Sequence, residues 1–186
     1  MQQLGAMQDW KLRVTHLIDH AAREHSEREI VSRWADGSET RTNWAGVRHD
    51  ALRMTQALRK LGVQPGDRIA TMAMNHHRHL VSWYGAVGVG GILHTLNPRL
   101  FDDQLEYIVN HAEDRVMLFD KVWTPIIERM KPRWPTVEHY ICFDSSEPAL
   151  HFEEWIGGED GQTEWHDGDE RDPCMLCYTS GTTGNP

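Results

Sequence analysis

The spacing of apolar and polar residues predicts helices and strands in alternation along the chain. Apolar residues recur at helical spacing over residues 12–22, which indicates an amphipathic first helix. Two short segments, residues 29–35 and 39–42, then flank an Asp-Gly pair, which is typical of a tight hairpin turn. The N-terminal quarter is therefore expected to hold one helix and one β-hairpin.

Helices and strands alternate more regularly in the rest of the chain. A long helix is expected between a cap at Thr42 or Asn43 and an end at Gly62. Further helices are predicted at residues 77–87, 102–111 and 122–130, and strands at residues 68–74, 92–96, 116–119, 137–143 and 174–178. Strands separated by helices of this length require right-handed βαβ crossovers. The predicted fold class is α/β, with a layered, mostly parallel sheet in one unit.

Composition and charge narrow the class of function. The chain has 186 residues, of which 39% are apolar and 25% charged, and its formal net charge is −9. Its length suffices for a sizeable core, and its acidity argues against a nucleic-acid or anionic-membrane surface. Acidic residues crowd between Asp144 and Asp172, where the only Lys or Arg is Arg171. This stretch is expected to be a solvated surface connection.

Targeting signals and cysteine usage indicate the compartment. The N-terminus lacks the pattern of a secretory signal and the chain has only three cysteines, so we expect a cytoplasmic protein. The longest stretch without Asp, Glu, Lys or Arg, residues 79–98, is interrupted by glycines and polar residues, which argues against a transmembrane segment. The eight tryptophans are scattered without a basic stripe, so no nucleic acid is expected as a partner.

A loop rich in hydroxyl groups and glycine follows the last predicted strand. It contains Thr179, Ser180, Gly181, Thr182, Thr183 and Gly184. Glycine lets backbone N–H groups form an anion-binding concavity, and short hydroxyl side chains add donors with little bulk. Since parallel sheets bind ligands at the carboxyl ends of their strands, this loop is predicted to hold phosphate, the alternative being an ordinary surface loop. Its spacing fits neither a lysine-containing P-loop nor a dinucleotide fingerprint.

The segment Tyr178-Thr179-Ser180-Gly181-Thr182-Thr183-Gly184-Asn185-Pro186 resembles the phosphate-loop signature of the adenylate-forming (AMP-binding) superfamily. Residues 75–80 and 94–100 most resemble its medium- and long-chain fatty acyl-CoA synthetase branch. The resemblance covers nearly the whole chain but only about the first third of a family enzyme. It implies that residues 1–186 are a partial N-terminal AMP-binding domain that ends inside the phosphate-binding loop, with the C-terminal domain absent.

This resemblance implies an ATP-dependent acyl-CoA synthetase, which activates a fatty or short aliphatic carboxylic acid as an acyl-adenylate and transfers it to coenzyme A. Residues 179–184 would bind the ATP phosphates, and Thr179 would also help to ligate Mg²⁺. The catalytic residues are expected beyond Pro186, so none is named, and the 186-residue chain alone is expected to be inactive. The related branch includes homodimers, so a homodimer is a candidate assembly.

Two other functions stay open at this point. An adenylating enzyme could pass the acyl group to a carrier-protein thiol or to oxygen instead of coenzyme A. Alternatively, the 186 residues could form a nucleotide-binding or interaction module without turnover. The sequence does not predict the acyl chain length, nor does it separate methylthio from plain aliphatic acids.

Cysteine and histidine clusters invite a metal interpretation, which the pattern does not favour. Cys174 and Cys177 lie three apart in a predicted strand, which places their side chains on opposite faces and about 10 Å apart. Buried structural thiols are expected there. His76 and His79 are expected to share a helical face, but no carboxylate lies within that cluster and Arg78 adds positive charge. Packing at a helix start or a subunit contact is expected instead.

Overall fold

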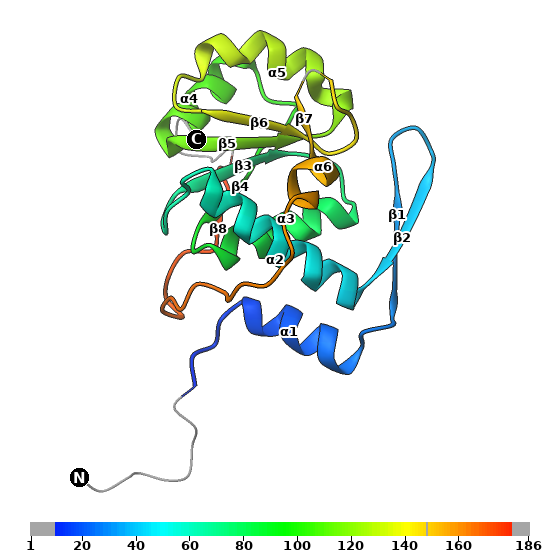
Figure 1. The fold of residues 1–186 in the computed structure, drawn as a ribbon. Coiled ribbons are helices and arrows are strands. Elements are labelled where there is room, and N and C mark those ends of the chain that lie inside the picture. Colours follow the sequence, from blue (N-terminus) through cyan, green and yellow to red (C-terminus); the bar gives the residue numbers. More distant parts are fainter. Residues whose placement is uncertain (1–9, 148, 180–186) are drawn as a thin grey trace, which may run out of the picture.

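The computed structural model describes residues 10–147 and 149–179. Its centre is a six-stranded sheet in the order β7-β6-β5-β3-β4-β8, in which every neighbouring pair is parallel (Figure 1). The strands are β3 (Arg68–Met72), β4 (Ile92–Thr95), β5 (Asp114–Phe119), β6 (His139–Cys142), β7 (Leu150–His151) and β8 (Met175–Leu176). The predicted parallel α/β sheet is therefore confirmed.

Helices cover both faces of this sheet (Figure 1). They are α1 (Thr15–Glu24), α2 (Trp44–Lys60), α3 (His77–Gly88), α4 (Asp102–Ala112), α5 (Thr124–Met130) and α6 (Phe152–Gly157), with short 3-10 turns η1 (Lys121–Trp123) and η2 (Lys131–Arg133). Helices α1, α2, α3 and α6 share one core cluster with the sheet, and α4 and α5 share the other. The sheet thus lies between two helical layers.

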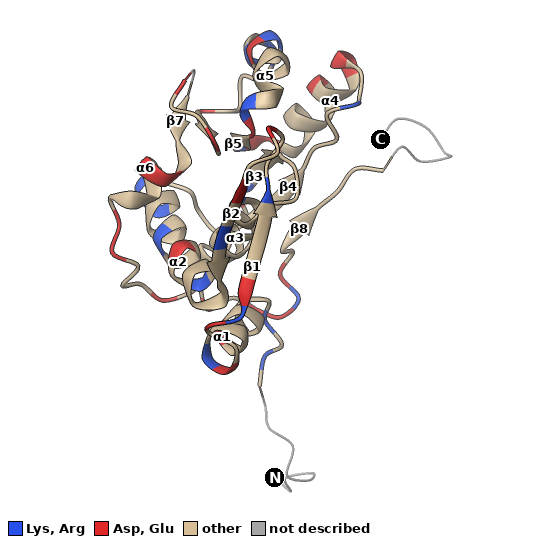
Figure 2. Cartoon of the chain, turned by 90° about the vertical axis from the view of Figure 1, so that its right-hand side faces the viewer, with Lys and Arg blue, Asp and Glu red and all other residues tan. Residues whose placement is uncertain are grey.

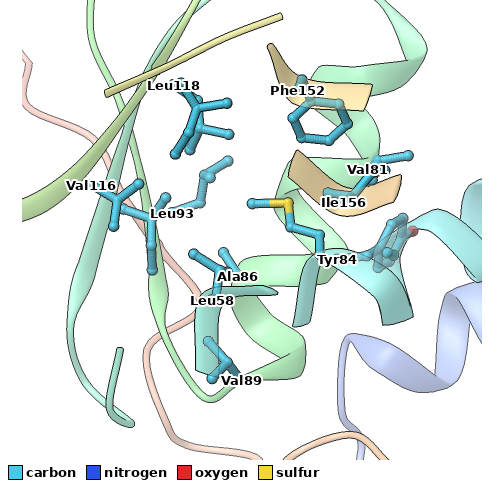
Figure 3. Packing of buried hydrophobic residues seen from close by; sticks show 14 of the residues in the cluster. Leu58, Val81, Tyr84, Ala86, Val89, Leu93, Val116, Leu118, Phe152 and Ile156 are labelled. Carbon is cyan, nitrogen blue, oxygen red and sulfur yellow. The ribbon is translucent and has the colours of Figure 1, made fainter. Parts of the chain in front are cut away.

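The sheet has two core clusters because successive side chains along each strand point to opposite faces. In β3, Ile69 contributes to the cluster under α2 and α3, whereas its neighbour Ala70 contributes to the cluster under α4 and α5. Both residues are fully buried. Figure 3 shows the first cluster, in which Leu93 and Leu118 of the strands face Val81 of α3 and Phe152 of α6. Burial of both faces explains why these strands read as nearly continuous apolar runs.

A two-stranded antiparallel hairpin, β1 (Glu29–Arg33) and β2 (Glu39–Asn43), lies outside the main sheet (Figure 1). Gly37 in its turn has φ = +86°, a conformation that glycine adopts without strain. Asn43 then caps α2, because its side chain accepts a hydrogen bond from the Gly46 N–H at 2.8 Å. The predicted hairpin and the Asn43 cap are both confirmed.

The acidic stretch between Asp144 and Asp172 is not simply a solvated connection, and in this respect the prediction was wrong. It contains β7 and α6, whose Phe152 and Ile156 are almost completely buried. Farther along, the Trp165 ring packs against Gly88 of α3, where a Cβ atom would have no room. Because apolar residues recur at helical spacing within α6, the helix forms and packs on the core despite the acidic residues around it. Figure 2 shows those acids on the outside of α6 and along the connection to β8.

Within the described part of the chain, no helix has the length and apolar character needed to cross a bilayer.

Candidate functional site

The residue that opens the predicted phosphate loop follows an edge strand. β8 is hydrogen-bonded to β4 and runs parallel to it, so Thr179 comes after the carboxyl end of the strand. The side chain of Thr179 is exposed. This is the location where a parallel sheet accepts ligands. The other predicted phosphate-binding residues, Ser180, Gly181, Thr182, Thr183 and Gly184, lie outside the described residues, and their role stays a prediction.

Tyr178, the residue before Thr179, packs back onto the sheet. Its hydroxyl oxygen lies 2.5 Å from Nδ1 of His111 at the end of α4, and its ring centroid lies 5.2 Å from that of His94 on β4. Burial raises the pKa of the Tyr178 hydroxyl, and the negative charge of Asp114 raises it further. The phenol therefore keeps its proton at neutral pH and can donate it to His111.

His94 and Asp114 form a buried pair beside Tyr178. Nδ1 of His94 lies 2.8 Å from Oδ2 of Asp114, the first residue of β5, and both side chains are fully buried. Burial raises the pKa of Asp114, whereas the hydrogen bond and the charge of His94 act in the opposite direction. Nε2 of His94 and Oδ1 of Asp114 have no hydrogen-bond partner among the described residues. Only half of the side-chain polar atoms of this pair therefore have a hydrogen-bond partner among the described residues.

A second buried pair, His76 and Asp120, lies at the carboxyl end of the sheet. Asp120 directly follows β5 and accepts a hydrogen bond from the Met74 N–H at 2.6 Å. Nδ1 of His76 accepts the backbone N–H of His79 at 3.1 Å, so the ring carries its proton on Nε2 and donates it to Asp120 at 2.8 Å. Each polar atom of both side chains therefore has a partner.

The predicted arrangement of the histidine cluster was wrong in one respect. His76 is the N-cap of α3 with extended backbone, so it does not share a helical face with His79. Its carboxylate partner, Asp120, directly follows β5, so local sequence spacing does not reveal the pair. A side chain in the cap position accepts a backbone N–H instead of projecting from the helix surface.

The neighbouring rings of His77 and His79 join three elements. Nδ1 of His77 lies 3.1 Å from Oγ of Ser32 on the hairpin, and Nε2 of His79 lies 3.0 Å from Oγ1 of Thr71 on β3. Burial lowers the pKa of His77 to about 4 and also lowers that of His79. In residues 10–147 and 149–179, no three His, Cys, Asp or Glu side chains gather as metal ligands would. The contacts are those of packing at the start of α3.

The predicted buried strand at residues 174–178 is shorter and more exposed than expected. Only Met175 and Leu176 are in β8, and 49% of Met175 is exposed. Cys177 is exposed and Cys174 is partly buried, so the prediction of two buried thiols was also wrong. The cause is the position of β8, which is the last strand of the sheet and has one strand neighbour in the described structure.

Residues 18–186 match the protein family described as AMP-binding enzyme. The chain belongs to this family. Among curated relatives, the 3-methylmercaptopropionyl-CoA ligase of Ruegeria lacuscaerulensis is 46% identical over 191 residues, which cover 98% of this chain and 35% of that protein. The medium-chain-fatty-acid–CoA ligase of Ectopseudomonas oleovorans is 42% identical, with the same coverage. This AMP-binding chain therefore spans about a third of the length of these relatives.

Solved structures agree with the fold of this AMP-binding chain. The anthranilate CoA ligase AuaEII, in complex with anthranoyl-AMP, superposes with a TM-score of 0.83 at 24% identity, over 95% of this chain and 34% of that one. The N-terminal domain of FACL13 from Mycobacterium tuberculosis gives a TM-score of 0.81 at 22% identity, over 95% and 43%. At such identities the likeness shows the fold alone.

Sequence reasoning predicts the loop and includes Tyr178 in its signature, but it did not predict the buried pair of His94 and Asp114 in this AMP-binding chain. His94 lies in the apolar segment of residues 92–96, and Asp114 begins another strand. Polar side chains inside apolar strands need hydrogen-bond partners, so each could have been marked as requiring one. Their pairing depends on the register of β4, β3 and β5, which the sequence alone does not show.

Proposed function

We propose that the protein acts as part of an ATP-dependent acid–thiol ligase, which converts a carboxylic acid into its coenzyme A thioester. The observation that carries the proposal is the position of Thr179, the first residue of a hydroxyl- and glycine-rich loop, after a parallel strand in a chain of the AMP-binding family. The names of the relatives, both CoA ligases, support the choice of coenzyme A as acceptor.

In this reaction the carboxylate attacks the α-phosphorus of ATP and pyrophosphate leaves. The thiolate of coenzyme A then attacks the acyl carbon of the acyl-adenylate and AMP leaves. Backbone N–H groups and hydroxyls of residues 179–184 would hold the β- and γ-phosphates, since short neutral donors can surround a polyphosphate closely. The donor set also fits Mg²⁺, which prefers oxygen ligands such as the hydroxyl of Thr179 and would neutralise phosphate charge.

The acid is proposed to be a fatty or short aliphatic one. The two relatives are named for 3-methylmercaptopropionate and for medium-chain fatty acids, and both are more than 40% identical to this chain. We further propose that residues 1–186 form part of an N-terminal AMP-binding domain that works with a C-terminal domain, in the cytoplasm and as a homodimer. The 186-residue chain by itself is then expected to form no acyl-adenylate.

Carboxylate-dependent exchange of pyrophosphate into ATP tests the proposal in the full-length protein. We expect exchange with 3-methylmercaptopropionate or with one of a series of straight-chain acids, followed by thioester formation when coenzyme A is added. Ser180→Ala combined with Thr182→Val should reduce exchange at least tenfold, about 1.4 kcal/mol for two lost phosphate contacts. Ser145→Ala, after β6, is the control and should leave the rate of pyrophosphate exchange unchanged.

The possible results separate the functions. Absence of exchange with every acid tested would refute adenylation. Exchange without a coenzyme A thioester would instead favour a carrier-protein thiol or oxygen as the acceptor. Exchange by the isolated 186-residue chain would contradict the expectation that it is inactive.

A further inference from the structure

The strand that leads into the phosphate loop has little support of its own. β8 contains two residues and pairs with β4 through Leu93–Met175 and His94–Leu176. A two-residue strand at a sheet edge forms few ladder hydrogen bonds, and strand ends open most easily. Its direction at Thr179 therefore depends on the side chains that follow the ladder.

Tyr178 supplies that support. Its ring lies between two histidines, since the centroid is 5.2 Å from that of His94 and 5.9 Å from that of His111, in an edge-to-face arrangement with the latter. Its hydroxyl reaches Nδ1 of His111 at 2.5 Å. The ring of His111 is itself stacked on Tyr107 one turn earlier in α4, with centroids 5.3 Å apart. One tyrosine thus connects the end of β8 to β4 and to α4.

The buried pair of His94 and Asp114 fixes the other side of this contact. Asp114 holds Nδ1 of His94 at 2.8 Å, which sets the orientation of the imidazole ring against Tyr178. Apolar residues of similar volume would fill the same space without unpaired polar atoms, and such replacements often stabilise proteins. Core stability alone therefore does not account for the pair.

We propose that Tyr178, His111, His94 and Asp114 form a positioning cluster that holds Thr179, the first residue of the phosphate loop, in the position needed for ATP binding. The proposal rests on the proposed function, because it assumes that residues 179–184 bind ATP phosphates. Tyr178 acts through the backbone of Thr179 and touches no substrate. When the cluster is weakened, the fraction of molecules with Thr179 in that position falls, and the apparent dissociation constant for ATP rises by the reciprocal of that fraction.

The test compares two phenol-to-phenyl substitutions in the full-length protein. Tyr178→Phe removes only the hydroxyl that reaches His111. Tyr140→Phe makes the same chemical change on β6, where the hydroxyl has no partner among the described residues. We expect Tyr178→Phe to raise the Kd for ATP by up to about fivefold, the equilibrium change that corresponds to one ordinary hydrogen bond. Tyr140→Phe should leave the Kd unchanged, and neither substitution should change the KM for coenzyme A.

A second pair of variants tests the partner on the exposed side of the cluster. His111→Ala removes both the acceptor and the edge-to-face contact with the Tyr178 ring, so it should raise the Kd for ATP at least as much as Tyr178→Phe. His111→Asn retains a side-chain acceptor and should restore part of the affinity. His111 is exposed, so both variants should fold. Nucleotide binding is measured at equilibrium without acid or coenzyme A, together with the melting temperature.

The failure of this proposal differs from the failure of the proposed function. If the wild-type full-length protein binds no ATP, the proposed function fails. If it binds ATP and Tyr178→Phe binds it equally well, the positioning cluster is refuted. Equal loss of affinity in Tyr178→Phe and Tyr140→Phe, in step with their melting temperatures, would also refute it, because the effect would then be general destabilisation.

Discussion

The two buried histidine–aspartate pairs have the same separation of 2.8 Å but differ in their remaining hydrogen bonds. Asp120 accepts from Met74 as well as from His76, and His76 caps α3 through its second ring nitrogen. By contrast, His94 and Asp114 each retain one buried polar atom without a partner in the described structure. Since unpaired buried polar groups cost free energy, the first pair is expected to stabilise the fold more than the second.

The sharpest test of this difference is removal of each carboxylate. Asp120→Ala strands two donors, the partly buried Met74 N–H and the buried Nε2 of His76, and should lower the free energy of unfolding by about 3 kcal/mol. Asp114→Ala strands one donor and also removes a carboxylate that is costly to bury, so about half that loss is expected. Urea unfolding of both variants measures the two losses. Equal losses would show that the unpaired atoms do not matter.

Replacing both members of each pair by leucine should sharpen the comparison. His94→Leu with Asp114→Leu removes every polar atom of that pair, so we expect a change of less than about 1 kcal/mol in the free energy of unfolding. His76→Leu with Asp120→Leu leaves the backbone N–H groups of Met74 and His79 unpaired, and about 2 kcal/mol should be lost. The expected difference between the pairs is contradicted if the double variant of His94 and Asp114 is less stable than the double variant of His76 and Asp120.

The sequence predicts the elements of this fold better than it predicts the contacts between them. Helix α4 and strand β5 lie within two residues of their expected bounds, because apolar residues recur at helical spacing in the first and follow one another directly in the second. Helix α6 was missed because acidic residues surround its apolar stripe. In the described part of the chain β8 pairs with one strand, which limits its extent, so local composition overestimated its length.

The same distinction applies to the candidate site. The loop signature and Tyr178 are contiguous in the sequence and could be read from it directly. Each histidine–aspartate pair joins residues that are distant in sequence, 20 apart for His94 and Asp114 and 44 apart for His76 and Asp120. Such pairs follow from strand register and from crossover geometry, which appear only when the chain is folded.

Substitution of Trp34 tests whether the pair of His76 and Asp120 also stabilises the hairpin of β1 and β2. Its ring stacks on His76 with centroids 4.5 Å apart, and the guanidinium of Arg78 lies 4.8 Å from the ring centroid. Trp34→Leu should therefore lower the free energy of unfolding by about 1.5 kcal/mol, through lost stacking, lost cation–π attraction and the lost hydrogen bond from Nε1 to Oγ1 of Thr40. Trp123→Leu in η1 is the control, because its indole nitrogen has no partner among the described residues. If Trp123→Leu lowers the free energy of unfolding more than Trp34→Leu does, the contacts of Trp34 with His76 and Arg78 do not stabilise the hairpin.

A pH dependence is also expected in the region around the pair of His76 and Asp120. His77 lies next to His76, and burial lowers its pKa from 6.5 to about 4. The unfolded chain therefore takes up a proton at this residue before the folded chain does. The associated stability is fully present above about pH 6.5 and is lost as the pH falls towards 4.

The melting temperature of the wild type should fall between pH 7.5 and pH 5, and that of His77→Asn should fall less. His139→Asn on β6, where 37% of the side chain is exposed, is the control and should follow the wild type. Parallel curves for wild type and His77→Asn would mean that the histidines at the start of α3 do not set the acid limit of the fold.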